Sequence, residues 1–145
     1  VKGSANVNVG GIIGWIRYQN NAAAYANNMT IAVTNNENSG NISSSGTGYG
    51  TGGIVGLAYN QATVTGNKNT AGTISGGTFA AGIVGGLQAN AENLSTGESV
   101  RFTVTGNTST TAENDITGIC KDLFACNNEP GNDAFAKIEN NTPNA

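Results

Sequence analysis

Histidine is absent from this sequence, and charge and proline are scarce. Only 10% of the 145 residues are charged, whereas roughly a quarter are charged in typical soluble proteins. The two prolines, Pro130 and Pro143, both lie near the C-terminus. Because disordered chains are usually rich in charge and proline, this composition favours a folded chain. At this length we expect one domain, which stays soluble through its amide and hydroxyl side chains.

Clusters of basic residues and long apolar runs are also missing. The six lysines and arginines are scattered and the net charge is −3, which argues against a nucleic-acid partner. No apolar run approaches the roughly 18 residues that suggest a membrane helix, so we predict no transmembrane segment. The chain starts at Val1 without a signal peptide, and we interpret it as a processed form or an excised piece.

Cysteine occurs only at Cys120 and Cys126. Such a pair cannot complete a zinc site alone, and the chain has no histidine to help. We predict an intrachain disulfide between them in an oxidising compartment, with two free thiols as the alternative.

Glycine, in contrast, is abundant, and much of it falls in repeated motifs. A Gly-Ile motif recurs as Gly11-Ile12-Ile13-Gly14, Gly53-Ile54-Val55-Gly56, Gly82-Ile83-Val84-Gly85 and, in degenerate form, Gly118-Ile119-Cys120-Lys121. A Val-Thr motif recurs as Val33-Thr34-Asn35-Asn36, Val64-Thr65-Gly66-Asn67, Val104-Thr105-Gly106-Asn107 and, loosely, Ile138-Glu139-Asn140-Asn141. A third motif reads "GNIS" (40–43), "GTIS" (72–75) and, more weakly, "NDIT" (114–117). Such self-similarity indicates a repeat architecture.

Each motif has the features of a short strand that ends at a corner. The β-branched residues suit a pleated, half-buried strand. The residue after Val-Thr is Asn or Gly, which tolerate a left-handed backbone, so we predict a turn there. The next residue is Asn in every copy, which predicts a hydrogen-bonded ladder of stacked amides. Glycines of the Gly-Ile motif would permit close backbone approach and unusual dihedral angles at a corner.

Three short β segments in each repeat predict a coil with three faces. We therefore predict an all-β fold, a parallel β-helix (β-solenoid) of about four irregular coils. Successive Gly-Ile motifs are 42, 29 and 36 residues apart. Three of the four coils carry roughly ten extra residues between the Gly-Ile and Val-Thr motifs, so these loops should project from one side of the stack.

The two ends of the predicted stack differ. We assign residues 1–119 to the repeats and 120–145 to a small C-terminal cap of the same domain, because Lys121 replaces the motif's last glycine. In this cap "KDLFAC" (121–126) could form a short helical turn. Residues 1–9, in contrast, enter the first coil as a bare alternating strand. Unpaired strand edges invite pairing with another chain, so we predict end-to-end or strand-exchange self-association, with a filament or fimbria-like assembly as its extreme form.

Two combinations of motifs, "NNENSGNIS" with "TGGIVG" and "NTAGTIS" with "AAGIVG", resemble the GLUG-motif repeats of secreted and cell-surface bacterial proteins. The resemblance covers about residues 9 to 120. It implies an extracellular or cell-surface location and an adhesin-like or accessory role, with no catalytic residues to carry over.

No set of residues predicts catalysis. Lyases and glycosidases that resemble this architecture need a base with cations or a pair of carboxylates. The three aspartates, Asp115, Asp122 and Asp133, all lie in the C-terminal quarter, and none recurs beside a second acid in a repeat. Without histidine, Ser-His-Asp and Cys-His chemistry is excluded. We expect no enzymatic activity and no cofactor.

Two segments carry residues suited to binding a ligand. Trp15, Arg17, Tyr18 and Tyr25 could bind a surface glycan through their aromatic faces, with packing over the coil as the structural alternative. Asn127, Glu129 and Asp133, in "NNEPGND" (127–133), could bind calcium through oxygen ligands, with a polar turn as the alternative.

A further alternative is ice binding. "TVT" at 63–65 and 103–105 predicts threonines that point outward and valines that point inward, in line with Ala32 and Thr34 of the first coil and Lys137 and Glu139 of the last. Our leading prediction is a non-catalytic extracellular surface protein, an adhesive or structural module whose partners are copies of itself or host glycans. A carbohydrate-binding or polysaccharide-active accessory domain and an ice-binding protein are the alternatives.

Overall fold

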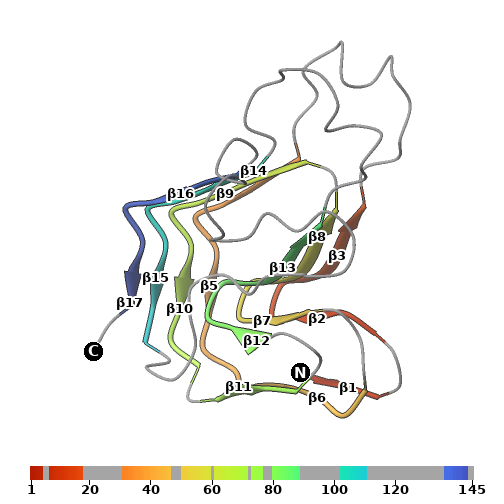
Figure 1. Cartoon of the computed structure of the whole chain (residues 1–145). Helices are drawn as coiled ribbons and strands as arrows, with labels where there is room; N and C mark the ends of the chain where they lie inside the picture. Colours follow the sequence, from red (N-terminus) through yellow and green to blue (C-terminus); the bar gives the residue numbers. More distant parts are fainter. Residues whose placement is uncertain are drawn as a thin grey trace.

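The chain folds as a parallel β-helix, as the sequence predicted. The computed structural model describes residues 1–4, 7–17, 31–46, 50–59, 61–71, 73–76, 80–88, 102–110 and 136–143. Within these ranges the chain forms short strands and no helix. Strands that are equivalent in successive repeats lie side by side and pair in parallel, so the repeats stack into coils (Figure 1).

The strands form five sheets, which we letter in the order in which the chain enters them. Sheet A contains β1 (Lys2–Gly3), β6 (Ile42–Ser44) and β11 (Ile74–Ser75). Sheet B contains β2 (Val9–Gly10), β7 (Thr51–Gly52) and β12 (Ala80–Ala81). Sheet C contains β3 (Ile13–Arg17), β8 (Val55–Tyr59) and β13 (Val84–Gln88). Sheet D contains β4 (Ala32–Thr34), β9 (Ala62–Thr65), β14 (Phe102–Thr105) and β16 (Ala136–Glu139). Sheet E contains β5 (Glu37–Asn38), β10 (Lys68–Asn69), β15 (Thr108–Ser109) and β17 (Thr142–Pro143).

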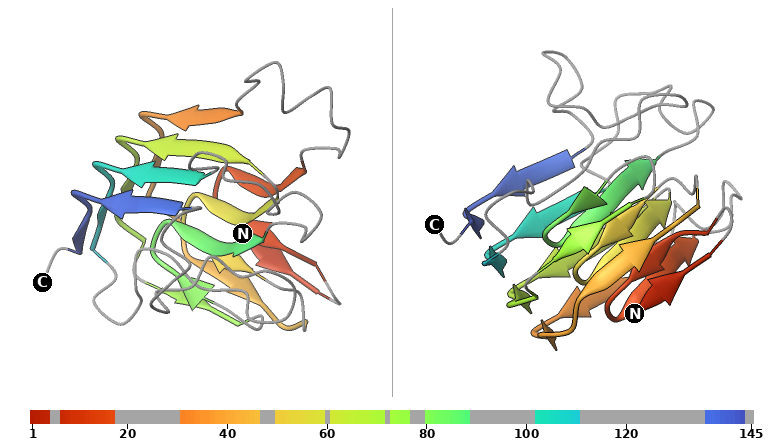
Figure 2. Two further views of the ribbon diagram at one scale, coloured as in Figure 1. Left: turned by 45° about the horizontal axis from the view of Figure 1, so that its top comes forward. Right: turned by 90° about the horizontal axis from the view of Figure 1, so that it is seen from below.

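Each of the first three coils has five strands among its described residues, so the prediction of three β segments and three faces was wrong. Coil 1 is β1–β5, coil 2 is β6–β10, coil 3 is β11–β15, and β16 and β17 belong to coil 4 (Figure 2). The extra strands arise because each of the two main motifs includes a corner. The Gly-Ile motif turns the chain from sheet B into sheet C, and the Val-Thr motif turns it from sheet D into sheet E.

Close backbone packing explains the glycines at the corner between sheets B and C. A Cβ atom on Gly11 would collide with the carbonyl oxygen of Gly53, and one on Gly53 with the carbonyl oxygen of Gly82. A Cβ on Gly56 would lie 2.7 Å from the backbone N of Val9. Glycine is therefore required here for close approach. The prediction of unusual dihedral angles was wrong at this corner, because neither Gly11 nor Gly53 has a positive φ.

Two apolar cores lie inside the coils. The larger core lies between sheets C and D, where the valines of the Val-Thr motif point inward as predicted. Phe102 is its largest fully buried side chain. The smaller core lies between sheets A and B and is formed by Val9, Ile42, Ala71 and Ile74. In Figure 1 sheet B lies between sheet A below and sheets C and D above, so it separates the two cores.

The strand register confirms that the coils differ in length. In sheet C, Ile13 pairs with Val55 and Val55 pairs with Val84. The chain passes from sheet C to sheet D between Tyr59 and Ala62 in coil 2, but over 18–31 in coil 1 and 89–101 in coil 3. The extra residues are thus at one corner, as predicted, although most of them lie outside the described residues.

The two chain ends are also part of the stack. The prediction of one bare strand over residues 1–9 was wrong, because β1 and β2 are separate strands that pair with Ser43 and Thr51 of coil 2. No other described strand pairs with the opposite edge of β1 or β2. At the opposite end, β16 and β17 extend sheets D and E within the segment expected to form the cap. Residues 120–135 and 144–145 of that segment, with the helical turn predicted over 121–126, lie outside the described residues.

Candidate functional surfaces

The corner between sheets D and E has the same left-handed turn in all four coils. Its turn residues, with φ in parentheses, are Asn35 (56°), Gly66 (67°), Gly106 (65°) and Asn140 (55°). These are left-handed angles, which glycine and asparagine adopt at a lower energetic cost than other residues. The turn that the sequence predicted after Val-Thr is therefore confirmed in every copy.

The asparagine after each turn forms the predicted ladder. Oδ1 of Asn67 accepts hydrogen bonds from the backbone N (2.9 Å) and from Nδ2 (3.0 Å) of Asn36. The same two bonds join Asn67 to Asn107, at 2.9 and 3.0 Å, and Asn107 to Asn141, at 3.0 and 2.9 Å. Each step thus runs in one direction, with donors in one coil and the acceptor in the next.

A second ladder, which the sequence analysis missed, lies two residues further on. Asn38 donates from Nδ2 to Oδ1 of Asn69 at 2.9 Å, and Asn69 donates from Nδ2 to Oγ of Ser109 at 3.2 Å. All three side chains are buried. The recurrence of an Asn two positions after the first one, in "NEN" and "NKN", was the available sequence signal. Together the two ladders satisfy the buried polar groups of sheet E.

Among the described strands, sheet D ends at β4 of coil 1, which has a strand partner on one side alone. Thr63 N donates to Ile31 O at 2.8 Å and Asn35 N donates to Thr65 O at 3.1 Å, so Ile31 and Asn35 face coil 2. Because alternate residues of a parallel strand bond to opposite neighbours, the backbone N–H groups of Ala32 and Thr34 face away from the stack. Both residues are exposed.

The Asn ladder also ends at coil 1 with an unused acceptor. Asn36 uses its backbone N and Nδ2 as donors to Asn67 Oδ1, and Nδ2 also donates to Thr34 O at 3.1 Å. Among the described residues, no donor reaches Oδ1 of Asn36, although the equivalent oxygen of Asn67 or Asn107 accepts two hydrogen bonds.

Coil 1 also exposes apolar side chains. In the described part of the chain, the exposed large apolar residues all belong to this coil: Val1, Val7, Ile12 and Trp15. Ile12 is 46% exposed, whereas Ile54 and Ile83, at the same position of the Gly-Ile motif, are 0% exposed. The same motif is therefore buried or exposed according to its place in the stack.

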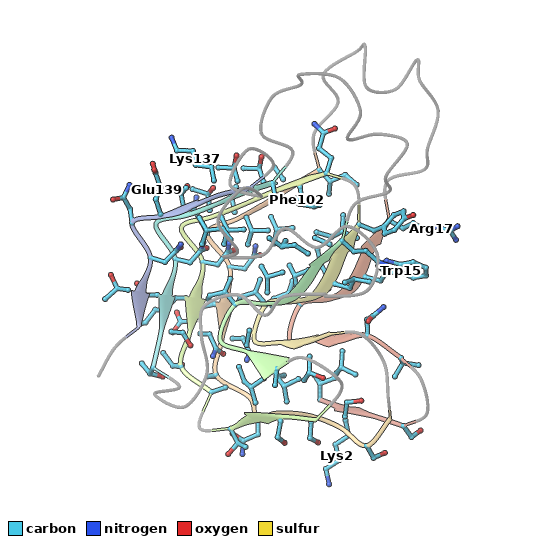
Figure 3. All side chains as sticks on the ribbon, viewed as in Figure 1. Lys2, Trp15, Arg17, Phe102, Lys137 and Glu139 are labelled. Atoms are coloured by element: carbon cyan, nitrogen blue, oxygen red, sulfur yellow. The ribbon has the colours of Figure 1, made fainter. Side chains whose placement is uncertain are left out.

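The outer face of sheet C holds part of the predicted glycan site. Trp15 is 49% exposed, and the guanidinium of Arg17 lies over its ring, 5.2 Å from the centroid. Both side chains point away from the coil (Figure 3). Tyr59 of coil 2 pairs in register with Arg17, and Gln88 of coil 3 pairs with Tyr59. The sequence did not lead us to expect this row of residues. All three residues come three positions after the last glycine of a Gly-Ile motif, which was the available signal. Tyr18 and Tyr25 lie outside the described residues.

The outer face of sheet D carries the predicted threonine array. Thr63 pairs with Thr103, and Thr65 pairs with Thr105, with the last two hydroxyl oxygens 3.4 Å apart. Coil 4 continues the rows with Lys137 and Glu139, whose charged groups are 3.0 Å apart. The outward orientation of the threonines is confirmed, and ice binding by this face stays a prediction, which a thermal-hysteresis measurement would test.

Other predicted site residues lie outside the described residues. They are the disulfide pair Cys120 and Cys126 and the calcium candidates Asn127, Glu129 and Asp133. Among the residues that the structure does describe, no group of three His, Cys, Asp or Glu side chains is placed to hold a metal ion. The same part of the chain contains no helix of the length and apolar character that crossing a membrane requires.

Comparisons of this chain with family models, with curated proteins and with solved structures found no match.

Proposed function

We propose that this chain is a non-catalytic structural or adhesive module of the cell surface or extracellular space, and that it associates with copies of itself through the open end of coil 1. The observation that carries the proposal is the concentration of exposed large apolar side chains on that coil among the described residues. One of them, Ile12, lies at a motif position that is buried in coils 2 and 3. The extracellular location is supported by the resemblance of the repeats to GLUG motifs.

The open edge of coil 1 favours association for two physical reasons. Unpaired N–H groups at the edge of a sheet are a template for a further strand, and proteins usually cover or charge such edges. Coil 1 carries little charge: its described charged side chains are Lys2, Arg17 and Glu37, and Glu37 lies 3.4 Å from Lys68 of coil 2. Electrostatic repulsion would therefore oppose contact only weakly.

Sedimentation velocity over a wide concentration range tests this proposal. We expect the wild-type chain to self-associate as its concentration rises, and Ile12→Lys to remain monomeric because a charge then lies on the open end. Thr63→Lys is the matched control, since it adds the same charge to the outer face of sheet D and should associate like wild type. A wild-type chain that stays monomeric throughout would overturn the proposed function.

The pair formed by Trp15 and Arg17 favours glycan binding as a second candidate function. With Arg17 over the ring, the indole still keeps 49% of its surface exposed, so apolar ring surface remains for a sugar. Trp15 is the single tryptophan of the chain, so intrinsic fluorescence reports on this site alone. Titration with a panel of oligosaccharides should change that fluorescence, and Arg17→Gln should weaken the response. A panel that leaves the emission unchanged would eliminate this candidate.

A further inference from the structure

We infer that two copies join head to tail, with coil 4 of one copy stacked on coil 1 of the next. In this arrangement sheet D continues from β16 of the first copy into β4 of the second, and Asn141 donates to Oδ1 of Asn36. The inference rests on the proposed self-association through coil 1 and specifies the surface of the second copy that coil 1 meets.

The polarity of the Asn ladder selects this arrangement. Oδ1 of Asn141 accepts two hydrogen bonds from Asn107, and its Nδ2 donates back to Val104 O at 2.8 Å. Within the described residues, its backbone N has no acceptor, although the same atom of Asn107 donates to the next coil. Coil 4 thus ends the ladder with a donor and coil 1 ends it with the acceptor Asn36 Oδ1. A joint between two coil 1 ends would instead oppose two acceptors.

The backbone of sheet D is complementary at the same two ends. Gly106 N donates to Glu139 O at 3.4 Å, so Glu139 faces coil 3. By the alternation of a parallel strand, the backbone of Ile138 faces away from the stack. Ile138 follows Val33, Val64 and Val104 in register, and the row of Thr34, Thr65 and Thr105 ends at Glu139. A second copy stacked in the same register would place its Thr34 beside Glu139.

Sheet E contributes less to this joint. Thr142 N donates back to Asn107 O at 2.8 Å. The backbone of the next residue, Pro143, therefore faces away from the stack, but proline lacks an N–H to donate. An experiment that tests the joint should therefore target sheet D.

Disulfide trapping between two variants that each carry one added cysteine tests the geometry. Neighbouring strands lie about 4.8 Å apart, which is within the Cα–Cα range of about 4.4–6.8 Å that a disulfide spans. We expect a mixture of Thr34→Cys and Glu139→Cys chains, under mild oxidation, to give a dimer linked between positions 34 and 139. Peptide mapping by mass spectrometry identifies this bond and distinguishes it from bonds to Cys120 or Cys126. Each variant alone should give little dimer linked through its new cysteine.

A proline at the edge of sheet D provides a second measurement. Thr34→Pro removes an N–H that faces away from the stack, so the fold should be kept while self-association weakens, by roughly tenfold or more for a lost bond and a steric block. Thr34→Ala is the control, because it keeps the N–H and should associate like wild type. If circular dichroism shows that Thr34→Pro does not fold, the trapping experiment still decides.

The outcomes separate this inference from the proposed function. Trapping between positions 34 and 139 supports head-to-tail joining. Trapping between two copies of position 34, or association that Thr34→Pro leaves unchanged, overturns head-to-tail joining but leaves self-association in place. A wild-type chain that is monomeric in sedimentation, with no trapped dimer, overturns both.

Discussion

Asn67 donates two hydrogen bonds to one oxygen atom of Asn107, from its backbone N at 2.9 Å and from Nδ2 at 3.0 Å. Its own Oδ1 accepts the same two bonds from Asn36. Nδ2 of Asn67 also reaches Val33 O at 2.8 Å. One side chain that is 1% exposed thus connects three coils, which makes the ladder a main source of order along the stack.

Replacing Asn67 should therefore destabilise the whole β-helix. Asn67→Ala leaves the donors of Asn36 and the carbonyl oxygen of Val33 without this partner, and each unsatisfied buried group costs about 1–3 kcal/mol. We expect a loss of about 3 kcal/mol or more in the free energy of unfolding, measured by urea denaturation. Asn36→Ala, at the end of the ladder, should cost clearly less, and equal losses would contradict the ladder's role.

The turn at Gly106 should tolerate asparagine but not alanine. Gly106 has φ of 65°, and a Cβ there would meet nothing closer than 4.0 Å, so only the backbone angle is at issue. A left-handed angle costs a residue with a Cβ about 1–2 kcal/mol. We expect Gly106→Ala to lower the free energy of unfolding by about that amount. Gly106→Asn should cost less, because Asn35 and Asn140 adopt the same angle. Equal effects of the two substitutions would refute this explanation.

Removing the hydroxyl of Thr51 should stabilise the fold. Thr51 is 0% exposed in sheet B, and its Oγ1 has no hydrogen-bond partner in the described part of the chain. It lies between Val9 and Ala80 in register, so valine would match the neighbouring side chain. Thr51→Val should raise the free energy of unfolding by about 1 kcal/mol. Thr63→Val, on the outer face of sheet D, should change it far less; a destabilised Thr51→Val chain would mean that the hydroxyl is satisfied.

Phe102 should be the most sensitive position of the larger core. Among the described residues it is the largest fully buried side chain, and its neighbour in register, Ala62, is small. Phe102→Ala would leave a cavity that Ala62 cannot fill, at a cost of about 3–5 kcal/mol. Val1→Ala, at an exposed position, should change stability by no more than about 0.5 kcal/mol. Both values can be measured by thermal or urea unfolding, and a loss below 1 kcal/mol at Phe102 would show that the core repacks.

Much of the Val-Thr corner could be predicted from the sequence, because its cause is local. The left-handed turn depends on which residue follows Thr34, Thr65 or Thr105, and Asn or Gly is visible there in the sequence. The ladder follows from the turn, since residues at equal positions in stacked coils are neighbours. The second ladder depends on the same stacking, but a serine in its third position obscured the pattern.

The Gly-Ile motif could be predicted less well. Gly11-Ile12 resembles the end of a strand, yet it forms a corner between two strands. Its glycines are required by the carbonyl groups of the next coil, which are 42 residues away in the sequence for Gly11 and 29 residues away for Gly53. No local pattern contains that contact, and this is why five strands in each coil were mistaken for three.

By itself the sequence determined the parallel β-helix, the turn at each Val-Thr motif and the presence of the Asn ladder, because these follow from residue types that recur at fixed places. Only the tertiary structure decided which copies of a motif are covered. Ile12 and Ile54 occupy the same place in their motifs, yet one is 46% exposed and the other 0%. The physical reason is that Ile54 lies in coil 2, between coils 1 and 3, whereas among the described residues Ile12 has a neighbouring coil on one side alone.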